Sequence, residues 1–390
     1  MKKKLIAVAV AGALGVPGVA LAQASTVQVY GLLILNYQYL DQGAGRPKTD
    51  MFNQHDANIG FKGEEALGGG TSAWFQCESS MDVSGSSAIA NSGAQLCGRN
   101  SAFGMKGGFG NVYAGIWDSP MKQTMGNFRP FSTSGAFGMG GLMWNEATGA
   151  VNGGAGAAGF TRRQTNLWSY ASPVIGGFQA MGAFSAANEA TAQLNSTTVT
   201  KARLWGLSAQ YTNGPLIVGG GYEKHNDYNP AAQSTTGTGI NNYTGGSDRA
   251  FSLGVAYTFM GKLKASLMYA DKKYGLAAGQ GLSQKSWSAH IDWDLGGPNR
   301  IRAGWTRAGD TSGNFVGNVN QFVGNNGAGG TSANLYAVQY AYAFSKRTEL
   351  NAGYARVDNS SNALYRLQTL GNSNVGQDQN AWVIGAKHTF

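Results

Sequence analysis

Three polar side chains occur at alternate positions near residue 290: His290, Asp292 and Asp294. Alternate residues of an extended strand project from the same face, so these three could bind a metal ion together or act as an acid and base pair. The chain has three more histidines, and none shows metal-like spacing to this group: His55, His225 and His388. We therefore favour a polar strand face over a reactive site, and expect no catalytic or metal-binding residues.

A second motif has the form Gly-x-Gly-x-x-Gly, at residues 154–159. In a dinucleotide site this spacing brings backbone amides against a pyrophosphate at the start of a helix. Here the motif lies within the glycine-rich segment 149–159, and no strand–helix–strand pattern surrounds it. The segment is therefore interpreted as a flexible loop, and no cofactor is expected.

The first 22 residues differ in composition from the rest of the chain. Three lysines at positions 2–4 precede an apolar run over 5–19 and the small-residue sequence Ala20-Leu21-Ala22, which is typical of a cleaved signal peptide. The alternative is an N-terminal anchor helix, but the apolar run is short for a membrane span and contains three glycines and a proline. We expect cleavage before Gln23, with residues 23–390 forming one domain.

The charge and hydropathy of the remaining chain restrict its class. The sequence has 29 basic and 20 acidic residues and a formal net charge of +9, which falls to +6 without the three lysines of the leader. Basic residues are scattered singly, so nucleic acid is not an expected partner. No stretch beyond residue 22 is apolar and uncharged over the ~18 residues that a membrane helix needs, so a membrane-spanning form would have to be a closed β-barrel.

Apolar residues alternate with small or polar residues over several stretches, most clearly at 251–259, 287–295 and 336–344. This period of two is typical of strands with one apolar face. Aromatic residues gather at the ends of these stretches, as in the interfacial girdle of a membrane barrel, whereas a soluble sandwich would bury the apolar face against a second sheet. The pattern predicts an all-β fold, a transmembrane antiparallel β-barrel.

The breaks between the stretches alternate in length. Segments 213–214 and 260–261 are short, whereas 40–56, 119–161 and 226–247 are long. Short turns at one rim and long loops at the other are typical of outer-membrane barrels. Counting between the breaks gives about sixteen strands, which leave a water-filled lumen, whereas eight-stranded barrels fill their interior with side chains.

The longest connection, 119–161, is rich in large apolar residues: Phe128, Phe131, Phe137, Met139, Leu142, Met143 and Trp144. Loops of this length in a compact domain are usually functional or disordered. These side chains suit a segment that packs inside a larger structure. In a wide barrel, that place is the lumen.

Two cysteines, Cys77 and Cys97, lie 20 residues apart. In a chain exported to an oxidising compartment, one disulfide is the leading prediction. The alternative is two inert thiols, since sequence alone does not place the two Cα atoms within bridging distance.

Five short stretches occur in a recognisable order: VQVYG at 27–31, IGFKGEEALG at 59–68, GFGNV at 108–112, SKRT at 345–348 and GAKHTF at 385–390. In this order they resemble the general porins of Gram-negative outer membranes, especially their betaproteobacterial branch. The resemblance covers the whole chain after the leader. It implies a sixteen-stranded barrel, usually a homotrimer, with the third extracellular loop folded inward as a constriction. It also implies contacts with outer-membrane lipid and lipopolysaccharide, and with the barrel-assembly machinery.

The resemblance further implies a charged constriction, since arginines of the family face the inward loop from the opposite wall. By local match, Arg99 and Arg163 occupy two such places. The other charged residues expected at the pore constriction are Lys62, Asp118, Glu146 and Arg162. Two places depart from the family pattern: Asn58 stands where close relatives often carry Arg, and Gly115-Ile116 replaces the usual Gly-Arg. We therefore expect only a mild anion preference.

The expected function is passive diffusion of small hydrophilic solutes and ions, with the size limit set by 119–161 and no enzymatic activity. The alternative is an outer-membrane barrel enzyme, lipase- or protease-like, but the nucleophile and oriented base that it needs are not legible. An energy-coupled transporter is disfavoured, because strand one is expected near Val27 and leaves no room for a plug. The last strand is expected to end at Phe390, as the signal for barrel assembly, and to face outward with these residues: Trp382, Ile384, Ala386, His388 and Phe390.

Overall fold

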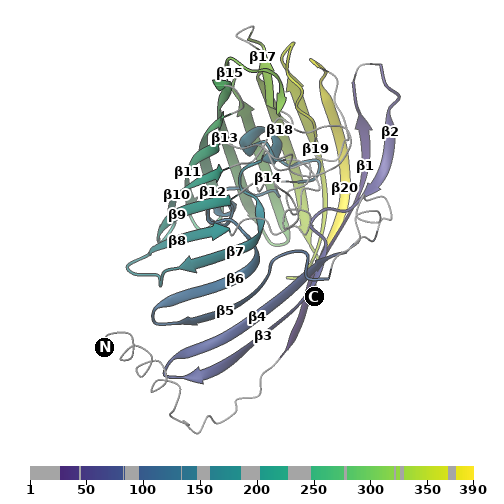
Figure 1. Ribbon diagram of the computed structural model, residues 1–390. Helices are drawn as coiled ribbons and strands as arrows, with labels where there is room; N and C mark the ends of the chain where they lie inside the picture. The colour runs from purple at the N-terminus through teal and green to yellow at the C-terminus, as the bar shows by residue number, and fades with distance from the viewer. Residues whose placement is uncertain are drawn as a thin grey trace.

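The computed structural model describes residues 27–43, 45–81, 83, 96–132, 134–146, 159–185, 203–226, 247–275, 279–319, 322–325, 329–367 and 375–390. Most of them form strands that lie side by side around a barrel (Figure 1). The first ten strands are β1 (Gln28–Asp41), β2 (Thr49–Asn53), β3 (Asn58–Gly68), β4 (Thr71–Ser80), β5 (Ser101–Gly107), β6 (Gly110–Asp118), β7 (Arg163–Ala171), β8 (Phe178–Ser185), β9 (Arg203–Asn213) and β10 (Leu216–Asn226). The others are β11 (Ser247–Phe259), β12 (Leu263–Gly275), β13 (Gly281–Gly296), β14 (Asn299–Ala308), β15 (Ser312–Gly313), β16 (Val316–Val319), β17 (Phe322–Asn325), β18 (Ala333–Ala343), β19 (Thr348–Asn359) and β20 (Gln379–Thr389).

The barrel is antiparallel, and the first and last strands close it. β1 pairs with β20 along one edge, from Leu32 opposite Thr389 to Asp41 opposite Asn380. Along its other edge β1 pairs with β2 and β3, which lie end to end and together occupy one strand position. With the short β15 and the separate hairpin of β16 and β17 set aside, the described residues form sixteen strand positions. This confirms the predicted fold class.

The two faces of the sheet differ as the alternation predicts. Along β11, Phe251, Leu253 and Val255 are exposed, whereas the intervening Ser252 and Gly254 are buried. The exposed apolar face of the barrel sheet points outward, because the loop described below covers the opposite, inner face. Outward residues of β20 include Trp382 and Ile384, followed by His388 and the exposed Phe390, as predicted.

The connections also alternate in length, with one correction. The expected long break at 40–56 is wrong in part, because β2 forms within it and pairs with residues 36–40 of β1. The hairpin between these strands extends the barrel wall beyond its neighbours (Figure 1). None of the helices in the described residues has the length and hydropathy to cross a membrane.

The connection between β6 and β7 contains the described helices. α2 (Pro120–Met125) is capped by the Ser119 hydroxyl, which accepts a hydrogen bond from Lys122 N, and begins with a proline, both favourable features of a helix start. η2 (Gly126–Phe128) follows directly, and α3 (Gly140–Trp144) ends at Asn145 in the left-handed conformation. Asparagine tolerates this conformation better than most residues, which explains the stop.

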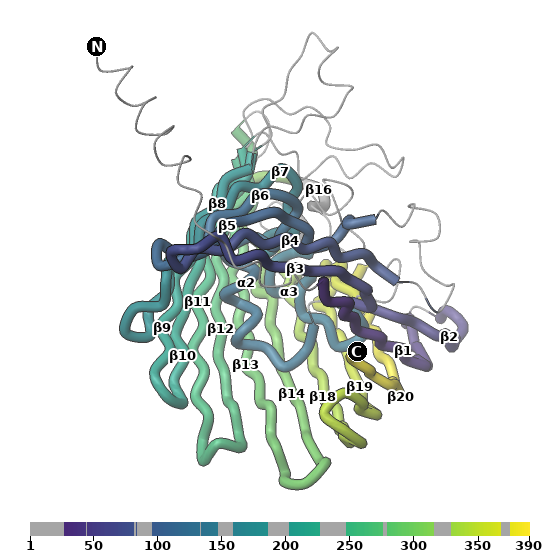
Figure 2. Tube along the Cα trace, turned by 90° about the horizontal axis from the view of Figure 1, so that it is seen from below, coloured from purple at the N-terminus to yellow at the C-terminus, as the bar shows by residue number. Residues whose placement is uncertain are grey.

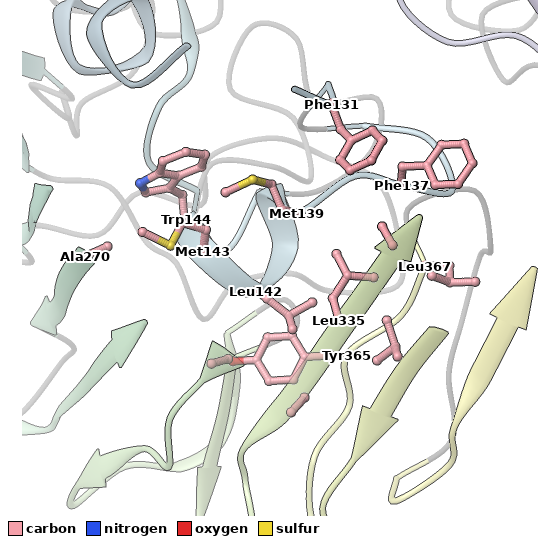
Figure 3. Close-up of a cluster of buried hydrophobic side chains, with 14 of the residues drawn as sticks. Phe131, Phe137, Met139, Leu142, Met143, Trp144, Ala270, Leu335, Tyr365 and Leu367 are labelled. Atoms are coloured by element: carbon pink, nitrogen blue, oxygen red, sulfur yellow. The ribbon is translucent and has the colours of Figure 1, made fainter. Parts of the chain in front are cut away.

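This connection lies inside the barrel (Figure 2). α2 packs against β9, β10 and β11, and α3 packs against β12, β13, β14 and β18. Figure 3 shows α3 with its apolar side chains against the inner wall; buried members of the cluster include Phe131, Phe137, Met139, Leu142, Met143, Trp144, Leu335 and Tyr365. The largest apolar core of the described chain therefore lies between the loop and the wall, as the loop's apolar residues predict.

Polar contacts hold the loop at defined points of the wall. Lys272 Nζ on β12 donates to the carbonyl oxygens of Leu142 and Met143, each at 3.0 Å, and to Ser286 Oγ at 2.9 Å. Trp144 Nε1 donates to Ser252 Oγ at 3.0 Å. All of these side chains are buried, so the contacts satisfy polar groups that water does not reach.

Close approach of the loop depends on small wall residues. A Cβ placed on Gly221 of β10 would lie 2.9 Å from Met121 Cα, and one on Gly254 of β11 would lie 2.5 Å from the Phe128 ring. Any side chain at these positions would push α2 and η2 away from the wall. The high glycine content of the sequence therefore has a structural reason at these inward positions.

Candidate pore constriction

The first part of the candidate site lies on the inner faces of β1, β3 and β4. Arg99 Nε donates to Glu78 Oε1 at 2.6 Å, and Tyr30 Oη donates to Glu78 Oε2 at 3.1 Å. Lys62 Nζ lies 5.1 Å from the centroid of the Tyr30 ring, within range of a cation–π contact. Of the two predicted constriction residues here, Arg99 contacts the Glu78 carboxylate directly, and Lys62 contacts the Tyr30 ring whose hydroxyl donates to that carboxylate.

The second part lies where β6 ends and β7 begins. Asp118 Oδ1 is 3.4 Å from both Arg163 Nε and Lys122 Nζ, and Asp118 Oδ2 accepts from Asn100 Nδ2 at 3.0 Å. Arg163 Nε also donates to Asn100 Oδ1 at 2.7 Å. Asn100 directly follows Arg99, so it joins the two parts into one network along the wall.

This wall network carries more positive than negative charge. Its cations are Lys62, Arg99, Lys122 and Arg163, and its carboxylates are those of Glu78 and Asp118. The Asp56 carboxylate, which lies between β2 and β3, also interacts with Arg99 and Lys122. One positive charge therefore remains when all three carboxylates are counted. Because both arginines make ion pairs, their effect on a passing ion is weaker than that of isolated cations.

The disulfide holds the first part of the network together. Cys77 and Cys97 are bonded, with their Cα atoms 4.6 Å apart, which confirms the predicted bridge. Cys77 lies in β4 next to Glu78, and Cys97 lies two residues before Arg99. Arg99 N donates to Glu78 O at 2.8 Å. The bridge therefore keeps the segment that carries Arg99 against the strand that carries Glu78.

The middle of the inward loop reaches the wall at the break between β2 and β3. Ser132 and Ser134 both donate hydroxyl hydrogen bonds to the Asp56 carboxylate. Gly135 lies against the ring of His55, since a Cβ there would meet the ring at 2.8 Å. The loop is thus held at β9–β14 on one side of the barrel and at residues 54–57 on another.

The electrostatics of this contact favour an ionised Asp56 and a neutral His55. Burial raises the pKa of Asp56, but His55, the Ser132 hydroxyl, Arg99 and Lys122 lower it more, so the net pKa lies below the usual range of an aspartate. Burial lowers the pKa of His55, partly opposed by Asp56. At neutral pH the serine hydroxyls therefore face a charged acceptor.

Two of the predicted constriction residues, Glu146 and Arg162, make contacts near the end of the inward loop. Glu146 accepts a hydrogen bond from the Thr161 hydroxyl, and the adjacent Asn145 donates to Tyr274 on β12. The backbone carbonyl oxygen of Arg162 accepts a hydrogen bond from Ser119 N. Asn58, where relatives often carry Arg, is buried and donates to the Asp56 carbonyl. It therefore adds no charge.

Sequence reasoning missed Glu78, Lys122 and Asn100. Glu78 lies at an inward position of β4, one residue after Cys77, so the predicted bridge to Cys97 was a signal that it lies near Arg99. Lys122 follows Asp118 by four residues, but the helix start that brings the two together is not evident without the structure.

The trio on β13 lies on the inner face, as a polar wall would require. His290 shares a hydrogen bond with Ser288, Asp292 lies 3.5 Å from Arg300, and Asp294 accepts from Gly296 N. Among the residues that the structure describes, no group of three or more His, Cys, Asp and Glu is placed to hold a metal ion. The Gly-x-Gly-x-x-Gly motif at 154–159 lies outside the described residues except for its last glycine.

A closed barrel of this size with an inward loop and a charged wall is the architecture of a diffusion pore. The family model of Gram-negative porins matches residues 7–362. The chain belongs to this porin family. It is 27% identical to outer membrane porin protein 32 of Delftia acidovorans over 400 residues, covering 100% of both chains. It is 28% identical to an outer membrane porin protein of Bordetella pertussis, covering 90% of this chain and 93% of that one.

A solved structure supports the fold of this porin independently. The anion-selective porin from Comamonas acidovorans superimposes with a TM-score of 0.74 at 23% identity, covering 94% of this chain and 100% of that chain. The family resemblance stated from the sequence is therefore confirmed. As a Gram-negative porin, the protein is a β-barrel channel of the outer membrane.

Proposed function

We propose that this porin passes small hydrophilic solutes and ions by passive diffusion with a mild preference for anions. The observation that carries the proposal is the wall network, in which four cations lie among three carboxylates, those of Glu78, Asp118 and Asp56. Rings of Lys and Arg favour anions at a pore. The structural neighbour described as anion-selective has the same barrel architecture, which supports the same direction of preference.

The inward loop sets the size limit in this proposal. Its apolar core and the hydrogen bonds of Lys272, Trp144 and Ser132 hold it against the wall at separate places. A loop held in this way narrows the lumen without closing it. The protein then acts as a channel and catalyses no reaction, in line with its porin relatives.

The proposed assembly is a homotrimer in the outer membrane, formed after a leader of residues 1–22 is removed. The leader lies outside the described residues. The broad exposed apolar face of the barrel supports both lipid contact and contact between copies. N-terminal sequencing of the purified protein should begin at Gln23, and unheated electrophoresis should show a species of three times the monomer mass.

The outer face also supports contact with lipopolysaccharide. Lys224 pairs with Arg249, and Arg249 pairs with Lys273, on three adjacent strands. These cations share the outward face with Tyr222 and Phe251, on the side of the long loops. Like charges directly opposite one another are unfavourable, so an anionic partner would stabilise this row. The phosphate groups of lipopolysaccharide are negatively charged and could therefore bind this row of cations.

Single-channel recording in a planar bilayer tests the channel proposal directly. In a gradient of potassium chloride, the zero-current potential should correspond to a modest excess of chloride permeability. A potential of cationic sign would overturn the anion preference. Failure of the purified trimer to conduct ions would overturn the channel function itself.

A further inference from the structure

A separate cluster of charged side chains lies at the short-turn end of the barrel. It lines a pocket of about 290 Å³ between β13, β14, β18, β19 and β20. Five basic residues line this pocket: Arg300, Arg302, Lys346, Arg347 and Lys387. Two carboxylates line it as well, those of Asp294 and Glu349.

The pocket opens on the inner face of the barrel. Arg300 pairs with Ala341 and Arg302 pairs with Gln339, both of which are buried, whereas the alternate residues Tyr340 and Tyr342 are exposed on the outer face. Lys387 lies opposite Glu349 on the same inner face. Solutes at this mouth of the channel can therefore reach these side chains.

The carboxylates of the pocket are already engaged. Arg302 Nη1 and Nη2 donate to the two oxygens of Glu349 at 2.8 and 2.9 Å, a bidentate pair that uses both acceptors. Asp294 accepts the Gly296 amide at 2.8 Å. Arg300 lies 3.5 Å from Asp292 and stays substantially exposed. The short-range contacts of the acids therefore go to the arginines of β14, while Lys387 interacts with Glu349 only at longer range and two further cations remain.

The three cations without such a short-range contact are Lys346, Arg347 and Lys387, and none makes an ion pair with another described residue. Backbone bonding holds their segments together, since Thr389 N donates to Arg347 O at 2.9 Å and Lys387 pairs with Glu349. Three like charges on neighbouring segments repel one another, so a bound anion would lower the energy of the group.

We propose that this pocket is a weak binding site for small oxyanions that carry two or more negative oxygens, such as phosphate and dicarboxylates. This proposal rests on the proposed anion-preferring channel and adds a site for such solutes at the short-turn mouth of the barrel. Arginine presents a planar fork to carboxylate and phosphate, and lysine adds point charge. The hydroxyls of Thr348 and Thr389 line the same pocket and can donate further hydrogen bonds. Open access keeps binding weak enough for release.

The test measures block of chloride current in a planar bilayer by inorganic phosphate and, separately, by succinate, added to one side at a time. The variant is the triple Lys346→Gln, Arg347→Gln and Lys387→Gln. Its half-blocking concentration should rise roughly tenfold for one or both anions, because three cations that make no ion pair within the described chain are lost. Block should be stronger from one side of the wild-type membrane than from the other.

A matched control removes three cations from the outer face: Arg203→Gln, Lys285→Gln and Arg307→Gln. These residues share the outward face with Trp205 and Trp287 and change the net charge equally. The control should keep the wild-type half-blocking concentrations. Unchanged block in the pocket triple, or an equal loss in the control, would overturn the site.

Two further measurements keep the test interpretable. If the triple does not assemble, Lys346→Gln alone, in an exposed turn, should raise the half-blocking concentration about twofold. Titration calorimetry of the detergent-solubilised trimer with inorganic phosphate should show heat of binding that the pocket variant loses. The wild-type channel could prefer anions and yet show neither block by these anions nor heat of binding. That result would overturn the binding pocket but leave the proposed channel function standing.

Discussion

Arg99 and Glu78 are joined twice, through an ion pair of 2.6 Å between Nε and Oε1 and through a backbone hydrogen bond of 2.8 Å. Their side chains are 16% and 12% exposed. Glu78 therefore compensates much of the charge that Arg99 would otherwise present to the lumen. Its position is consistent with the mild anion preference proposed above.

Changes to the wall network should alter selectivity in opposite directions. Arg99→Ala with Arg163→Ala should shift the zero-current potential toward cations, and Glu78→Gln should shift it toward anions. A unit charge ~8 Å from the ion path contributes about 0.5 kcal/mol in water, or about a twofold change in permeability ratio, and less at high salt. Planar-bilayer recordings at low and high salt measure this. Equal potentials in all three proteins, with conductance intact, would place the selectivity determinants elsewhere.

Lys272 is expected to keep the inward loop in position. Lys272→Met removes the lysine donor to the Leu142 and Met143 carbonyls; Leu142 O keeps its hydrogen bond from Ser286 Oγ, whereas loss of the bond to the buried Met143 O costs about 1–3 kcal/mol. The variant should show a higher and noisier single-channel conductance and a lower thermal unfolding temperature. Lys285→Met, on the outer face of β13, is the matched control and should behave as wild type. A quiet Lys272→Met channel with the wild-type conductance would contradict this role.

The disulfide should stabilise both the chain and the position of Arg99. Labelling of denatured, unreduced protein should detect no free thiol, and reduction should expose both cysteines. Cys77→Ser with Cys97→Ser should lower the free energy of unfolding by ~3 kcal/mol in the chain-entropy model. It should also move the zero-current potential in the same direction as Arg99→Ala, though less. Two reactive thiols before reduction would remove the claim.

The sequence predicted the features of the fold and the site that depend on neighbouring residues, and missed those that depend on contacts between distant segments. Alternation along 251–259 and 336–344 predicted strands and their outward faces, because side-chain direction in a strand depends only on residue parity. The loop's apolar residues predicted its packing inside the barrel. The pairing of Arg99 with Glu78, and of Asp118 with Lys122, was not predictable, since it depends on register and on a short helix start. The extra strand β2 was missed because its five residues show no clear alternation.

Phe390 is expected to contribute to barrel assembly through its ring. Its backbone N and O both bond to Gly31 at 3.1 Å, across the seam of β1 and β20. Phe390→Ala keeps these backbone bonds and removes the ring, whereas deletion of Phe390 removes both. If the ring is the assembly signal, both variants should accumulate outside the outer membrane in cell fractionation, and Phe390→Trp should assemble. If Phe390→Ala assembles normally, the ring is not the signal, and any defect of the deletion variant is due to loss of the backbone hydrogen bonds.

The contact between Asp56 and the two loop serines predicts the behaviour of the channel in acid. The pKa of Asp56 is lowered below the usual value of ~3.9, so its stabilising contribution is present above that value and lost as pH falls through the lower, folded pKa. The lowered pKa of His55 acts in the same direction, since a buried neutral ring resists protonation. Conductance should therefore be steady at neutral pH, begin to lose stability as pH falls below ~6.5 through His55, and become most unstable below about pH 4 through Asp56.

A variant makes this prediction specific to Asp56. Asp56→Asn keeps the size of the side chain but removes the charge that Ser132 and Ser134 bond to and that Arg99 and Lys122 stabilise. At pH 7 it should show the unstable conductance that wild type shows only in acid. Asp50→Asn is the control, because Asp50 bonds Tyr37 on the outer face and does not touch the loop. Steady conductance of Asp56→Asn down to the same pH as wild type would show that other contacts hold the middle of the loop.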